Sequence, residues 1–309
     1  MAMDVSLLLV QTLNGIQFGV LLFLLAAGLT LVFGIMDLIN LAHGAFYMMG
    51  AYFAATLYKG TASFWIAAGL ALPLTFVLGL AVEMLTLRTM YTRNHLDQVL
   101  LTFGLILSFD EGVRLLWGPQ SQPLLKPALL EGQIQLIAGT PYPIYRLVII
   151  GLGLVVTLLL WLLVRRTRLG MQIRAGASNR QMVGALGVNI KVLFTLVFAL
   201  GATLAGLAGL VAGPLISIEP GMGDAILILS FVVIVIGGIG SIRGAFLGAL
   251  LVGLVDTLGR SFLTQVLGAF LAPATASGVG PALASMLIYI FMAAVLFFRP
   301  QGLFPVPGR

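Results

Sequence analysis

The side chains best suited to chemistry gather in the stretch GIMDLINLAHGAFYMMGAY, residues 34–52, which follows a long apolar run. Asp37, Asn40 and His43 supply a carboxylate, an amide and an imidazole within seven positions. Such groups can relay protons or line a polar path, and an ionisable side chain at the centre of a membrane helix costs about 2.5–3.5 kcal/mol. A kinked or re-entrant segment would turn them toward a cavity or an interface, whereas a plain turn would leave them at the membrane surface. Both interpretations remain open from the sequence.

A second polar break lies in GPLISIEPGMGD, residues 213–224, where prolines and glycines interrupt the helical pattern. Glu219 is expected either to line a water-filled cavity or to be an ordinary loop carboxylate. We therefore take Asp37, Asn40, His43 and Glu219 as candidates for a substrate path or a gate.

Motifs for catalysis are missing from the sequence. There is no cysteine, the two histidines are 52 positions apart, and neither a G-x-x-x-x-G-K-[ST] phosphate loop nor a G-x-S-x-G nucleophile elbow occurs. The glycines of GGIGSIRG have the wrong spacing for a dinucleotide fingerprint. We expect no catalytic residue, no metal site and no cofactor bound by this chain.

The composition indicates whether the helices that carry these residues lie in water or in a membrane. Of 309 residues, 60% are hydrophobic and 8% charged, and the mean hydropathy is +1.13. Soluble domains need about 25% charged residues to cover their surface, so we expect a membrane protein. The formal net charge of +6 comes from basic residues clustered in short loops. This pattern indicates orientation in a membrane and not binding to nucleic acid.

Apolar runs of about 20 residues predict the spans. The fold class that we expect is an all-α polytopic membrane protein with about 8–10 transmembrane helices, some of them broken or re-entrant, in a single transmembrane domain over residues 1–309. Full spans are predicted near 13–33, 65–87, 99–117, 144–164, 192–212, 245–263 and 281–298, and partial helices at 45–58 and 226–236.

Basic residues favour one orientation. With the N-terminus outside, eleven basic residues fall on the cytoplasmic face and three on the outer face, which predicts a cytoplasmic C-terminus. The first residues, MAMDVSLLLV, lack a basic n-region, so no cleaved signal peptide is expected. Near the span ends we expect ion pairs between Asp110 and Arg114, Asp256 and Arg260, and Glu83 and Arg88.

The most polar internal stretch, residues 165–191, carries six basic residues and no acidic one. Within it, residues 177–186 suit one short helix, with Ser178 or Asn179 as the N-cap and with apolar side chains on one side. The stretch is either an ordinary cytoplasmic loop or a docking helix for a cytoplasmic partner. The candidate coupling residues are Ser178, Asn179, Arg180, Met182 and Val183.

Small residues recur every fourth position in GATLAGLAGLVAG, residues 201–213. Gly201, Ala205, Gly209 and Gly213 would form one smooth groove that lets another backbone approach closely. This packing stripe is expected to hold helices of the same chain together, and a dimer interface is the alternative.

Several blocks of the sequence resemble the permease subunits of branched-chain amino-acid ABC importers. They follow the family's order over nearly the whole chain: GLTLVFGIMDLINLAHGAFYMMGAY (28–52), HLDQVLLTFGL (95–105), RAGASNRQMVGALGVNI (174–190), EPGMG (219–223), VIGGIGSIRGAFLGALLVGL (235–254) and RPQGLFP (299–305). Arg243 departs from the pattern, because the family often has proline at that place in GGIGSIPG.

The resemblance implies a fold like that of type II ABC-importer permeases, and it implies partners. These are a second related permease, two ATP-binding cassette subunits that use ATP and Mg²⁺, and a periplasmic or extracellular substrate-binding protein. It also implies that the segment around Asn179 couples the permease to the ATPases, in the cytoplasmic membrane of a bacterium or archaeon. Relatives that import urea or short-chain amides remain an alternative, as does a secondary transporter that works without ATPases.

Overall fold

The computed structural model describes residues 5–91, 93–137 and 140–305, and most of these residues are helical. In this part of the chain, six helices are long and apolar enough to cross a membrane. They are α1 (Val5–Met36), α3 (Phe64–Leu85), α5 (Ile144–Arg166), α8 (Ile190–Ala212), α10 (Ile242–Gly268) and α11 (Pro273–Phe298). The predicted all-α membrane fold is confirmed.

One of the seven predicted full spans, 99–117, is less apolar than the other six. Helix α4 (His95–Trp117) is there, but Asp97, Asp110, Glu111 and Arg114 lower its hydropathy, and it is not among the six. Helices α2 (His43–Thr61) and α9 (Met222–Gly237) are the predicted partial helices. The remaining elements are short: the 3-10 turns η1 (Leu87–Met90) and η2 (Ala128–Leu130), the antiparallel pair β1 (Gln133–Ile137) and β2 (Thr140–Pro143), α6 (Arg168–Ser178) and α7 (Arg180–Ala185).

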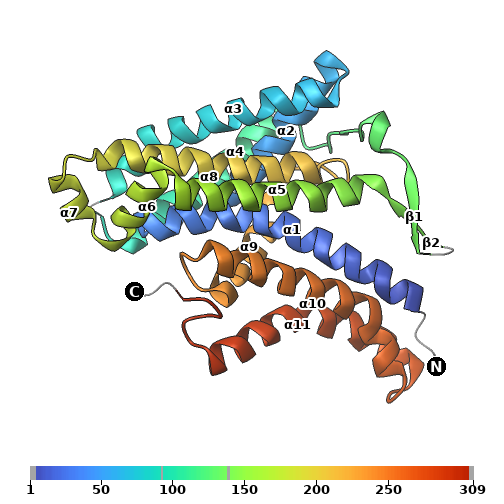
Figure 1. Ribbon diagram of the computed structural model, residues 1–309. Coiled ribbons are helices and arrows are strands. Elements are labelled where there is room, and N and C mark those ends of the chain that lie inside the picture. The colour runs from blue at the N-terminus through green and yellow to red at the C-terminus, as the bar shows by residue number, and fades with distance from the viewer. Residues whose placement is uncertain (1–4, 92, 138–139, 306–309) are drawn as a thin grey trace.

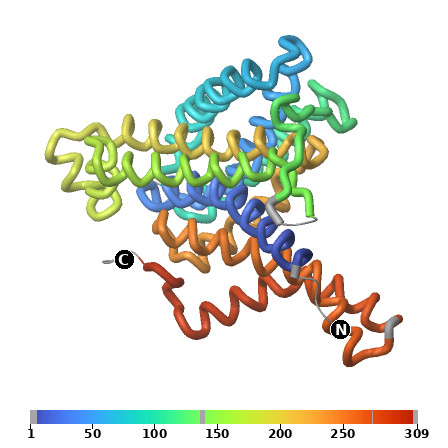
Figure 2. The backbone as a smooth tube through the Cα atoms, turned by 45° about the vertical axis from the view of Figure 1, so that its right-hand side comes forward, coloured from blue at the N-terminus to red at the C-terminus, as the bar shows by residue number. Residues whose placement is uncertain are grey.

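Helix α1 lies at the centre of the bundle (Figures 1 and 2). Its residues from Val20 to Val32 are almost all buried, because α1 is apolar all round and neighbouring helices cover every face. The α3, α8 and α5 helices lie on one side of it, and the pair α10–α11 lies on the other. The two ends of the bundle differ: one carries α6, α7 and the C-terminal residues, and the other carries the hairpin β1–β2 and the start of α1.

The chain breaks twice inside this bundle. Helix α1 ends at Met36, Asp37 adopts a left-handed backbone (φ 53°), and residues 38–42 are irregular before α2 starts at His43. The imidazole of His43 lies beside Gly28, since a Cβ on Gly28 would be 2.8 Å from Nε2. Gly28 precedes the end of α1 by eight residues, about 12 Å along a helix. The segment after Asp37 therefore re-enters the bundle.

The second break, residues 213–221, leads into α9 in a similar way. The first turns of α2 and α9 touch backbone to backbone, because a Cβ on Gly44 would collide with the carbonyl oxygen of Gly223, and the converse also holds. Two short helices thus start next to each other inside the bundle, each preceded by irregular chain. Discontinuous helices of this kind occur in transporters, where they line the path.

Candidate functional site

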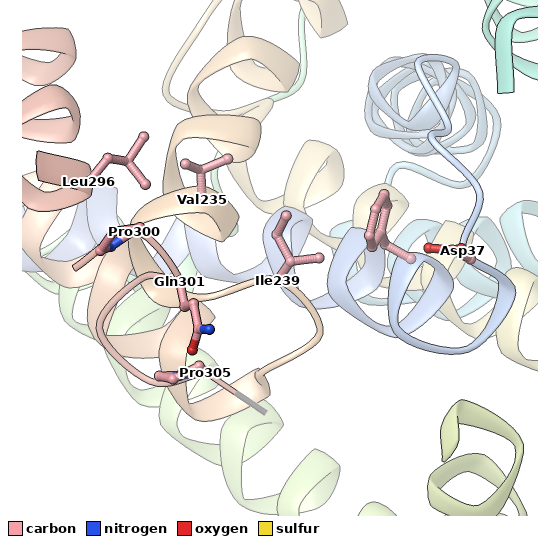
Figure 3. A pocket seen from close by; sticks show the side chains of 8 residues that line it. Asp37, Val235, Ile239, Leu296, Pro300, Gln301 and Pro305 are labelled. Atoms are coloured by element: carbon pink, nitrogen blue, oxygen red, sulfur yellow. The ribbon is translucent and has the colours of Figure 1, made fainter. Parts of the chain in front are cut away.

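Asp37 stands where α1 ends, and its side chain connects two parts of the site. Its carboxylate lies 3.8 Å from the guanidinium of Arg180, the first residue of α7, and both side chains are about half exposed. It also lines a cavity of about 460 Å³ together with Val235, Ile239 and residues of the C-terminal tail. Figure 3 shows Asp37 across this hollow from Pro300 and Gln301.

Asn40 and His43 are completely buried, and they do not line that cavity. Neither amide atom of Asn40 and neither ring nitrogen of His43 has a hydrogen-bond partner of good geometry among the described residues. The imidazole packs against the backbone of α1 near Leu25 and Gly28 and meets the ring of Phe46 at 6.4 Å. Buried polar groups are nearly always bonded, so unpaired ones indicate a functional place.

Glu219 is not brought together with these residues. It is exposed in the segment between α8 and α9, where its carbonyl oxygen accepts a bond from the backbone of Met222 at 3.2 Å. The adjacent Ile218 pairs with Gln122 of the loop that follows α4. Glu219 therefore lies exposed in the second break, as a loop carboxylate would.

The coupling segment differs from the single short helix expected over 177–186. Two helices form instead: α6 ends at Ser178, and Asn179 starts α7 by accepting a bond from the backbone N–H of Met182 at 2.9 Å. The apolar side chains of α7 do not share one side. Val183 is buried, whereas Met182 and Leu186, one turn apart, are exposed by 59% and 76%.

Arg180 has a second neighbour that the sequence did not indicate. Its guanidinium lies 5.9 Å from the ring centre of Phe194 in α8, and Phe194 meets Tyr91 edge-on at 5.2 Å. The hydroxyl of Tyr91 donates to Glu83. Arg180 thus contacts both the end of α1 and an aromatic pair beside a buried carboxylate.

Glu83 is fully buried and well paired. Arg88 donates to it at 3.2 Å, as expected, and the hydroxyl of Thr195 donates at 2.7 Å. Burial and the bond to Glu83 raise the pKa of Tyr91, so its phenol stays protonated and donates. Tyr91 and Thr195 were missed in the sequence, because Thr195 is 112 positions from Glu83 and no local pattern joins them.

The two other expected ion pairs have different outcomes. Arg260 binds Asp256 at 2.7 Å, as predicted. The prediction for Asp110 and Arg114 is wrong, since Arg114 binds Glu111 at 3.1 Å. On a helix the i,i+3 position is as near as i,i+4, and Glu111 is the more exposed carboxylate, which an arginine reaches without desolvation.

The packing stripe on α8 faces other helices of the same chain. A Cβ on Gly201 would lie 3.0 Å from the carbonyl oxygen of Gly28 in α1, and one on Gly209 would collide with that of Tyr47 in α2. Ala205 is fully buried, and Gly213 lies under Leu124 and Ile218. Among the residues described, no group of three His, Cys, Asp or Glu side chains could hold a metal ion.

Together these features define a polytopic α-helical membrane protein with broken helices at its centre, a class that includes transport permeases. Residues 11–296 match the profile of a family described as the branched-chain amino acid transport system / permease component. The chain belongs to this family.

The relatives are consistent with that assignment. The chain is 29% identical to the high-affinity branched-chain amino acid transport system permease protein BraD of Pseudomonas aeruginosa, over 96% of this chain and 95% of BraD. It is 30% identical to the corresponding protein LivH of Escherichia coli, over 82% and 86% of the two chains. The probable permease LivH of Methanocaldococcus jannaschii is 28% identical over 94% of this chain and 90% of its own length. No solved structure matches.

Proposed function

We propose that this chain is the transmembrane subunit of an ATP-driven importer for branched-chain or similar small amino acids. The observation that carries the proposal is the family match over residues 11–296, which includes both breaks and the coupling segment. The named substrates of BraD and LivH support the substrate class.

The proposed assembly contains a second related permease, two ATP-binding cassette subunits and an external substrate-binding protein. ATP and Mg²⁺ act on the ATPases, and this chain supplies the path. We place the α7 end in the cytoplasm and the N-terminus outside, because positive residues concentrate on the cytoplasmic side of membrane proteins. The start of α1 and the chain that follows α11 lie at opposite ends of the bundle (Figure 1), which suits this orientation.

In the proposed mechanism, α7 receives the motion of the ATPases. Its exposed Met182 and the exposed Leu186 that directly follows the helix form an apolar surface for docking. Arg180 then passes a displacement of α7 to Asp37, at the base of the re-entrant segment. Among the described residues, Asn40 and His43, in and after that segment, have no hydrogen-bond partner of good geometry, and a second arrangement in which they gain such partners would be favoured by that gain.

The decisive experiment is purification of the tagged chain from its native membranes, followed by mass spectrometry and reconstitution into vesicles. We expect two ATPases and a second permease to co-purify, and leucine uptake to require both ATP and the binding protein. If the vesicles take up urea or acetamide and not leucine, the substrate class would instead be urea or short-chain amides. Uptake by the chain alone without ATP would overturn the proposal.

Docking through α7 has its own test. Met182→Asp with Leu186→Asp places charges on the exposed face, and uptake should fall to background while the ATPases no longer co-purify. The matched control is Gln181→Asp, an exposed position on the same helix outside the apolar pair. Normal uptake in the double variant would rule out docking at this surface.

A further inference from the structure

A groove lined by arginines lies between α5, the start of α10 and the C-terminal tail, at the α7 end of the bundle. Its cavity measures about 980 Å³. Arg165 of α5, Arg174 of α6 and Arg243 of α10 line it, and Trp161, Phe246 and Leu247 supply apolar walls. We call it the arginine groove.

Among the residues that the structure describes, none neutralises the positive charge of the groove. No carboxylate lines the cavity, and the ion pairs within the described part of the chain use Arg88, Arg114, Arg180 and Arg260 instead. Arg165 lies 5.6 Å from the ring centre of Trp161, and Arg174 donates to the backbone oxygen of Val164. Both contacts hold the guanidinium groups in place without cancelling their charge, so the groove suits an anion.

The anion site continues into an apolar path. A second cavity of about 500 Å³ shares Leu247, Leu303 and Phe304 with the groove and extends past Leu250 and Leu251, and apart from Arg299 its lining residues are apolar. Helix α10 begins at Ile242 in the arginine groove, so these leucines lie deeper along it, toward the interior of the bilayer. A free phosphate needs no such path, whereas an acyl chain does.

We propose that the arginine groove binds one anionic phospholipid, with its phosphate at Arg165, Arg174 and Arg243 and an acyl chain along Leu247 and Leu251. Basic pockets between membrane helices bind anionic headgroups, and tryptophan favours the headgroup level. The proposal depends on the proposed function only for the leaflet, which is the cytoplasmic one in that orientation.

The proposed lipid site explains why arginine stands at position 243, where the family often has proline. Ser241 caps α10 by accepting a bond from the backbone N–H of Gly244 at 3.1 Å, so the turn forms with arginine in place of proline. The side chain of Arg243 is exposed and lines the groove.

The test is native mass spectrometry of the purified chain, with the partners that co-purify, titrated with phosphatidylglycerol or phosphatidylcholine. We expect phosphatidylglycerol to be retained preferentially. Arg165→Gln, Arg174→Gln and Arg243→Gln together should weaken its binding by about tenfold or more, since charge-assisted bonds to phosphate are lost. The matched control, Arg93→Gln, Arg166→Gln and Arg168→Gln, removes three exposed charges outside the groove and should bind normally.

Two further measurements separate a lipid from other occupants. Leu247→Trp with Leu251→Trp fills the apolar path, so it should weaken phosphatidylglycerol binding while the arginines remain. A photo-crosslinking residue at Leu247 should label lipid. Equal binding by the groove and control variants, displacement of the lipid by inorganic phosphate, or crosslinking of Leu247 to a protein chain would each overturn the proposal. Because none of these readouts measures transport, they stand apart from the test of the importer function.

Discussion

The two breaks in the bundle look alike in the sequence but differ in how their polar groups are satisfied. In the first, residues 37–42, Asp37 pairs with α7, and the side chain of Asn40 is buried without a hydrogen bond to any described residue. In the second, residues 213–221, Glu219 is exposed. The backbone of the second break is anchored, because the N–H of Gln122 donates to the carbonyl of Ile218 at 2.8 Å.

This difference assigns separate roles to the two breaks. The first is joined to the segment that we propose to contact the ATPases, and it contains buried groups that another arrangement could satisfy. The second is held by the loop that follows α4, and its carboxylate is exposed. The helices that follow the breaks, α2 and α9, touch at Gly44 and Gly223, so α9, which follows the anchored break, supports the start of α2. We therefore expect the first break to move and the second to stay.

The largest effect is expected where α2 and α9, the helices that follow the two breaks, touch. Gly44→Val forces side-chain atoms into the backbone of Gly223, and overpacking of this kind costs on the order of 3 kcal/mol. We expect a lower melting temperature and little monodisperse protein in size-exclusion chromatography. Gly69→Val in α3 is the control, because a Cβ there meets nothing within 4 Å. Equal behaviour of the two variants would mean that the helix starts are not in close contact.

The second prediction separates Asp37 from Glu219. Asp37→Asn keeps a residue that tolerates φ 53° but removes the charge, and a half-exposed ion pair contributes only about 0–1 kcal/mol to stability. Uptake should therefore fall while the melting temperature stays nearly constant.

The control for Asp37 is Glu219, the acidic residue of the second break, and Glu219→Gln should leave uptake near the wild-type rate. A second test exchanges the two charges. Asp37→Arg combined with Arg180→Asp should restore part of the uptake that is lost in Asp37→Asn. A swap with no recovery would mean that the ion pair does not transmit motion.

The sequence predicted the helical class and the partial helices, because long apolar runs and clustered Gly and Pro are local signals. It predicted that Asn179 could start a helix, but Gly170 and the residues around it form a separate helix before it, with Thr167 as its N-cap. The ion pair of Asp37 with Arg180 could not be predicted from the sequence, since 143 positions separate the two residues and each has closer charged neighbours in the sequence. Contacts of this kind depend on how the helices pack against one another, and the hydrophobic periodicity of the sequence does not indicate that packing.

The third prediction concerns the buried polar groups in and just after the first break, Asn40 and His43. His43→Ala should lower uptake at limiting leucine several-fold, because the imidazole is expected to gain a partner during the transport cycle. Asn40→Leu should lower uptake with little loss of melting temperature, since no hydrogen bond is broken in the present arrangement.

Ser217→Ala is the matched change in the second break, where the side chain is exposed, and should leave uptake unchanged. A strong loss of stability in Asn40→Leu would contradict the structure, because it would require a bond that the amide does not make.

The smallest effect is expected at the anchor of the second break. Gln122→Ala removes the side-chain bonds to Lys59 and to the carbonyl oxygen of Trp117, but it keeps the backbone bond to Ile218. Partly exposed side-chain contacts of this type contribute little, so the unfolding free energy should change by about 0.5 kcal/mol or less, and uptake should persist. A loss of uptake comparable to that of Asp37→Asn would mean that the second break also moves, and the assignment of motion to the first break alone would fail.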